Sequence, residues 1–257
     1  MKKISALIII GSIGLVAQAQ SVIDPLTGSL SGYTDTLVND GGSGGASSIS
    51  FTDSGSGLQA NFAGSVSDPE QALFLAPVSS FSTVFAVGDM LSVNVAVPAS
   101  AITEDFGLAV SATATPPAAG VNASTRANFD WASVSVRPSQ SSIRVNTSVS
   151  GTLTTGNNVA GIGTTANISQ LFIDWVSADS FQLGYVSNSV SVVDSTVNFA
   201  PGSTIGAAIG FYGDLRTTGT TLGDFSNLTI TAIPEPSTLA LCGVGFAGMA
   251  AWMRRRK

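Results

Sequence analysis

Two acid–aromatic pairs are the residues of this chain best suited to hold a ligand. Asp130-Trp131 and Asp174-Trp175 each lie in a segment that alternates like a β-strand, and Tyr212 precedes a Gly-Asp dipeptide. A carboxylate can accept hydrogen bonds from sugar hydroxyls while an indole or phenol covers the apolar face of the ring, so these five residues are candidate glycan contacts. Because neighbours in a strand point to opposite faces, the alternative places the aromatic rings in the core and the aspartates toward solvent.

Residues for catalysis are scarce. The chain has no histidine, and its single cysteine, Cys242, lies in an apolar run, so Ser-His-Asp and Cys-His catalysis are excluded together with His and Cys zinc sites. Retaining glycosidases need two carboxyl groups about 5–5.5 Å apart. Glu70 and Glu104 instead occur far apart, each in polar, turn-like surroundings. We therefore expect a protein that is not an enzyme.

Calcium is the one cofactor that the sequence suggests. Asp214 and Asp224, with Asn227 nearby, flank a Gly/Thr-rich loop whose carbonyl groups could complete an oxygen shell. No EF-hand or nonapeptide calcium repeat is present. This loop is a candidate calcium site.

The N-terminal 19 residues have the composition of a signal peptide. Lys2 and Lys3 precede an apolar core at 4–16, and Ala17 and Ala19 form the small-x-small pattern that signal peptidase reads. We expect cleavage after Ala19, and hence an exported protein.

The C-terminal end combines three features in a fixed order. Pro234, Glu235 and Pro236 form an extended, accessible element, an apolar run follows at 239–253, and four basic residues close the chain: Arg254, Arg255, Arg256 and Lys257. The run is long enough for a short transmembrane helix, and the basic end should stop transfer and stay inside. An ordinary membrane anchor would share the last two features but does not need the first.

This order closely resembles the PEP-CTERM sorting tail of bacterial surface proteins. The resemblance implies that residues 233–257 are recognised and cut by an exosortase, a membrane-embedded transpeptidase-like protease. The protein would be held in the membrane by the C-terminal helix before processing, and would then reach the cell surface or the extracellular space.

The charge of the remaining body limits its partners. Between residues 20 and 233 there are four arginines, no lysine and fifteen carboxylates, a net charge of −11. Such an acidic surface repels phosphate backbones, so nucleic acid is not an expected partner. Neutral glycans and calcium remain compatible with it.

The hydrophobic pattern of the body is that of short β-strands. We expect a flexible Gly/Ser-rich lead-in at 20–57 and one β-sandwich domain at 58–232. Predicted strands lie at 58–62, 81–87, 90–97, 106–112, 128–136, 142–149, 170–176, 181–186, 205–212 and 227–232. The fold class is therefore all-β, a two-sheet antiparallel sandwich, with a right-handed β-helix as the alternative.

Part of this body loosely resembles laminin-G and concanavalin-A-like jelly rolls. The resemblance spans 106–230 and rests on Phe129-Asp130-Trp131, on 181–185, on 206–212 and on the closing segment at 224–230. It implies a jelly-roll-like fold more than an activity.

Together these features predict an exported surface or matrix protein with a structural or adhesive role in an exopolysaccharide matrix. A carbohydrate-binding module is the alternative, and it would require a solvent-exposed tryptophan or tyrosine. A glycan-degrading enzyme would require two close carboxylates in a pocket.

Overall fold

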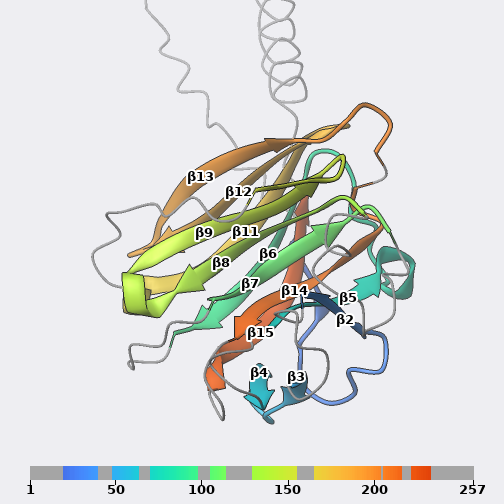
Figure 1. Cartoon of the computed structure of the whole chain (residues 1–257). Helices are drawn as coiled ribbons and strands as arrows, with labels where there is room; N and C mark the ends of the chain where they lie inside the picture. Colours follow the sequence, from blue (N-terminus) through green and yellow to red (C-terminus); the bar gives the residue numbers. More distant parts are fainter. Residues whose placement is uncertain are drawn as a thin grey trace, which may run out of the picture.

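The structure, a computed structural model, consists of two antiparallel β-sheets packed face to face (Figure 1). It describes residues 20–39, 48–63, 70–97, 105–113, 129–154, 165–203, 205–215 and 221–232. The predicted signal peptide with Ala17 and Ala19, and the predicted tail and helix at 233–257, lie outside these residues. Among the described residues, no helix has the length and apolar character needed to cross a membrane.

The first sheet has eight strands in the order β13-β12-β11-β6-β15-β4-β3, with β1 also paired to β15. These strands are β1 (Gln20–Asp24), β3 (Ser48–Asp53), β4 (Leu58–Ala63), β6 (Asp89–Ala96), β11 (Ile168–Ser177), β12 (Ser180–Ser187), β13 (Val190–Asn198) and β15 (Thr221–Ala232).

The second sheet has seven strands in the order β10-β9-β8-β7-β14-β5-β2. They are β2 (Thr34–Asn39), β5 (Glu70–Pro77), β7 (Asp105–Ser111), β8 (Trp131–Arg137), β9 (Ser142–Val149), β10 (Thr152–Thr154) and β14 (Ala208–Leu215). Three single-turn 3₁₀ helices complete the described elements: η1 (Val78–Ser80), η3 (Pro138–Gln140) and η4 (Thr165–Asn167).

The prediction of a two-sheet antiparallel sandwich is confirmed, and the β-helix alternative is wrong because every strand pair is antiparallel. Alternation placed most strands correctly. In β6, for example, Leu91, Val93 and Val95 are buried. Asn94 and Ala96 between and after them are exposed, as expected for a strand with one face toward solvent.

The structure differs from the expected lead-in at 20–57. Residues there form β1, β2 and β3, which pair with β15, β5 and β4, so the sandwich begins at Gln20 rather than at Leu58. The glycine- and serine-rich stretches between these short strands hide them in the sequence, although β1, β2 and β3 themselves contain no glycine. Sheet pairing supplies the stability that local propensity lacks.

The predicted strand at 81–87 is wrong. After η1 the chain turns, and the Asp89 carboxylate accepts a hydrogen bond from the Ala86 amide at 2.9 Å. Gly88 adopts a φ of 90°, which is unfavourable for other residues, and β6 begins only at Asp89. Phe85 is nonetheless buried in the core, which explains why an apolar residue occurs there without a strand.

Three phenylalanines join the sheets in the centre of the sandwich. The ring of Phe225 on β15 lies 4.9 Å from that of Phe211 on β14 and 5.4 Å from that of Phe106 on β7, measured between centroids. All three side chains are fully buried. Because β15 belongs to the first sheet and the other two strands to the second, these contacts cross the sandwich interior.

Trp175 closes one end of this core. Its ring stacks on Phe181 with centroids 5.1 Å apart and lies 5.2 Å from the ring of Phe85. A Cβ atom on Gly206 would approach Cζ3 of Trp175 to 2.6 Å, and Gly206 also has a φ of 92°. Glycine is therefore required here both by backbone conformation and by the indole ring.

Replacing Gly206 should measurably destabilise the protein. Gly202 is a matched control because its φ is 85° and nothing lies near its missing Cβ. We expect Gly202→Ala to cost roughly 1–2 kcal/mol from the left-handed backbone alone. Gly206→Ala should cost roughly 1–3 kcal/mol more, because the methyl group also displaces Trp175. Urea denaturation measures both, and equal losses would show that the indole contact imposes no constraint.

Candidate functional site

Charged residues gather on the face of the seven-stranded sheet that points away from the core. In β7 the side chains of Phe106, Leu108 and Val110 enter the core, so Asp105 lies on the opposite face. The register places Asp214 of β14 directly across from Asp105. Although this face is the outer one, Asp105 is 0% exposed and Asp214 is 1% exposed.

Two arginines from neighbouring strands neutralise Asp105. Arg137 Nε of β8 lies 3.0 Å from Asp105 Oδ1, and Arg144 Nη1 of β9 donates to Asp105 Oδ2 at 2.8 Å. On the other side, Gln71 Nε2 of β5 donates to Asp214 Oδ2 at 3.1 Å. We call these five residues the buried ion cluster, and their formal charges cancel. Five adjacent strands thus each contribute one member, so the cluster forms only when the sheet register is correct.

Burial is the main cause that raises the pKa of Asp105 to about 7; Arg144 opposes the shift, Asp214 adds to it, and Arg137 opposes it. The carboxyl group therefore titrates near neutral pH. This shift makes the cluster sensitive to pH.

Polar groups with unused hydrogen-bonding capacity lie beside the cluster. Among the described residues, four outward side chains of β9 keep a buried polar atom that has no hydrogen-bond partner: Ser142 Oγ, Arg144 Nε, Asn146 Nδ2 and Ser148 Oγ. Each such atom costs about 1–3 kcal/mol.

The aromatic candidates on the same face are not open to a ligand. The rings of Trp131 and Tyr212 lie 5.7 Å apart and stack, and their side chains are 2% and 0% exposed. They form a second apolar cluster with Leu73, Leu75, Ala109 and Ala208. In this structure neither ring presents a free face to a sugar, because both side chains are buried.

The remaining candidate glycan contacts have other environments. Asp130 joins two loops, accepting hydrogen bonds from the Ser150 amide at 2.7 Å and the Ser203 hydroxyl at 3.2 Å. Trp175 is partly buried in the end of the core described above. Asp174 is half-buried on the outer face of the eight-stranded sheet, where burial raises its pKa.

The two carboxylates of the candidate calcium site are not brought together. Asp214 belongs to the buried ion cluster in one sheet, whereas Asp224 lies on β15 in the other and accepts a hydrogen bond from Gln59 Nε2 at 2.5 Å. Within the described part of the chain, no three carboxylate or other ligating side chains form a metal-binding group. Sheet assignment, which the sequence does not reveal, separates these two residues.

Sequence reasoning missed the buried ion cluster. The available signal was a lone charge within an alternating strand, as at Arg144 in Ser142–Val149 and Arg137 at the end of Trp131–Arg137. The body has only four arginines, so two within neighbouring strands are conspicuous. Their common partner could not be found without the strand order.

Comparison with known families concerns the C-terminal end. Residues 232–257 match the PEP-CTERM protein-sorting motif, which confirms the predicted resemblance of the tail. The motif implies an exported protein that is directed to an exosortase and sorted to the cell surface. No curated protein matches the chain.

Solved structures resemble the body only distantly. A protein of unknown function from Shewanella oneidensis MR-1 is 13% identical, with a TM-score of 0.46 over 83% of this chain and 84% of its own. The carbohydrate-binding module CBM66 from Bacillus subtilis is 12% identical, with a TM-score of 0.41 over 78% and 95%. Lectin I-B4 from Griffonia simplicifolia is 10% identical, with a TM-score of 0.43 over 83% and 97%. These likenesses are too weak to carry a functional argument, and the sheets described above define the fold.

The buried ion cluster predicts a pH-dependent stability. Because the folded pKa of Asp105 lies near 7 and its ordinary value is 3.8, the folded state binds this proton more tightly. The stabilisation of the folded state by this proton is complete below about pH 4 and is lost as the pH rises through about 7. Asp105→Asn should remove this decrease in the free energy of unfolding with rising pH. The variant Ser133→Ala, a neutral change on the same face, should keep it. Urea denaturation between about pH 4 and 8 measures the slopes, and parallel curves for Asp105→Asn and the native protein would refute the assignment.

Proposed function

We propose that this protein is an exported structural or adhesive component of the cell surface or of an extracellular polysaccharide matrix. The observation that carries the proposal is the PEP-CTERM motif at 232–257, joined directly to a β-sandwich. Signal peptidase removes residues 1–19, the apolar run at 239–253 holds the chain in the membrane, and an exosortase then processes the tail.

The composition of the body is suited to an extracellular protein. It contains no cysteine, so its folding does not depend on the redox state of the compartment. The net charge of −11 between residues 20 and 233 favours solubility among neutral polymers and disfavours binding to nucleic acid.

A non-enzymatic role is supported by the state of the carboxylate pair. Asp105 and Asp214 lie opposite each other on adjacent strands, and neither is open to a substrate. Both Asp105 oxygens are already engaged by arginines. A glycosidase needs one carboxyl group to reach the leaving-group oxygen, and this arrangement prevents it.

The carbohydrate-binding alternative cannot rest on the predicted aromatic contacts. Trp131 and Tyr212 are buried against each other, and Trp175 packs on Phe85 and Phe181. Contact with a polysaccharide would have to use hydroxyl and amide side chains instead. The matrix role therefore remains the better supported of the two.

Changing Pro234, Glu235 and Pro236 to alanine tests the proposed route. The variant keeps the apolar run and the basic end, so it should still enter the membrane. Without the recognition element it should escape processing and accumulate there at full length after signal cleavage. Intact mass spectrometry of membrane and extracellular fractions, in a host that has the exosortase, gives the answer.

Pro201→Ala is the control because this exposed proline lies in the loop after β13, far from the tail in sequence. It should be processed and released like the native chain. If the triple variant and the native protein have the same masses in the same fractions, the tail is only an anchor and the proposed function fails.

A further inference from the structure

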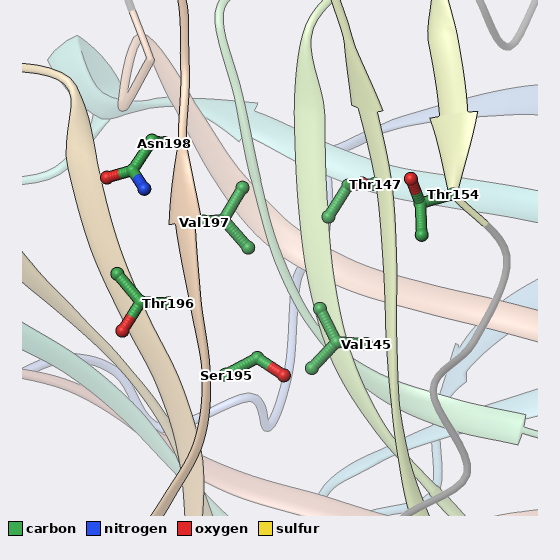
Figure 2. Close-up of a pocket in the computed structure, with 7 residues that line it drawn as sticks. All are labelled: Val145, Thr147, Thr154, Ser195, Thr196, Val197 and Asn198. Carbon is green, nitrogen blue, oxygen red and sulfur yellow. The ribbon is translucent and has the colours of Figure 1, made fainter.

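A cavity of about 310 Å³ opens at one side of the sandwich, between the edges of the two sheets (Figure 2). One wall comes from β9 and β10 and contains Val145, Thr147 and Thr154. The other wall is the end of β13, from Ser195 to Asn198. Figure 2 shows Ser195 and Val197 pointing toward Val145 and Thr147, whereas Thr196 and Asn198 point away from them, as alternation along a strand requires. Its volume lies at the lower end of the range for small-molecule sites.

The lining of this edge cavity is polar but uncharged. Hydroxyl groups come from Thr147, Thr154 and Ser195. Val145 and Val197 are buried and supply apolar surface beneath them. A charged ligand would lose its hydration without gaining a counter-charge here, so the lining favours a neutral one.

An acidic neighbour strengthens this preference. The carboxylate of Asp194, next to the cavity on β13, accepts a hydrogen bond from the Ser195 hydroxyl at 3.1 Å. It lies in an acidic body and would repel an anion. Uronic acids and phosphorylated sugars are thereby disfavoured.

Most of the polar groups in the cavity are available for a ligand. Within the described part of the chain, the side chains of Thr147 and Thr154 make no hydrogen bond to another residue. Each threonine hydroxyl can donate and accept, and the Ser195 hydroxyl, which donates to Asp194, can still accept. Hydroxyls set around apolar valines match a sugar ring, which has hydroxyl edges and apolar C–H surfaces.

The walls are held in place by the sheets. Ser195 to Asn198 pair with Leu183 to Ser180 of β12, and Thr147 pairs with both Ala132 of β8 and Thr154 of β10. Binding therefore requires little ordering of the backbone, which lowers its entropic cost.

We propose that the edge cavity binds one neutral sugar unit of an extracellular polysaccharide, an inference that rests on the proposed matrix function and adds the ligand class and the site. The lining includes no aromatic ring among the described residues, so each contact is weak. Many copies bound along one polymer would still be retained, because linked weak contacts add to a strong overall attachment.

The test measures binding of neutral oligosaccharides to the full chain in detergent micelles. The probes are cellotetraose, mannotetraose and chitotetraose, with tetragalacturonate as an anionic probe of similar length, and saturation-transfer NMR is the readout. We expect transfer to at least one neutral probe and none to tetragalacturonate. Thr147→Val with Ser195→Ala should weaken binding at least tenfold, whereas Ser191→Ala, on β13 outside the lining, should leave it unchanged.

Thr154→Val on the exposed strand β10 is a second variant in case the double variant does not fold, and it should also weaken binding. No transfer from any neutral probe, preference for the anionic probe, or equal binding by the folded variants would overturn the inference. If binding fails while the protein is still processed and found in the matrix, the proposed function stands alone. If binding holds but the protein is not exported, the proposed function fails and the site remains.

Discussion

The packing of Phe225 between Phe106 and Phe211 is the contact on which the rest of the structure depends. The body has no disulfide, so burial of apolar side chains must hold the two sheets together. Each buried phenylalanine contributes about 1.5–3 kcal/mol. Phe225 lies on β15, which pairs with β1, β4 and β6 and ends at Ala232, where the sorting motif begins. The tail thus follows a strand in the interior of the sheet, and cleavage beyond Ala232 leaves this strand intact.

Much of the fold could be predicted because alternation reports which face of a strand is buried. The strand prediction failed where buried and exposed residues do not alternate. β5 (Glu70–Pro77) is apolar on both faces, since Phe74 enters the core while Leu73 and Leu75 pack with Tyr212 on the outside. β13 has an irregular pattern because its pairing with β12 shifts register near Asp194. Both strands were therefore absent from the prediction.

The sites were harder to predict because they depend on register and strand order. Asp105 and Asp214 are more than a hundred positions apart in sequence, yet β7 and β14 are neighbours and place them opposite each other. The edge cavity likewise needs β9 and β13 to lie in different sheets. Trp131 and Tyr212 stack on each other in a second cluster on the outer face of the sheet, an environment that alternation alone does not reveal. The sorting motif, by contrast, is formed by contiguous residues, so its resemblance could be recognised from the sequence alone.

The mass of the mature protein recovered from the extracellular polysaccharide of its own cells tests the central claim most directly. The account predicts a chain that begins at Gln20 and lacks the apolar run at 239–253 and the basic end, with the sandwich complete through Ala232. A chain in that fraction that still carried Leu239 to Lys257, or a protein found only inside the cell with residues 1–19 attached, would contradict it.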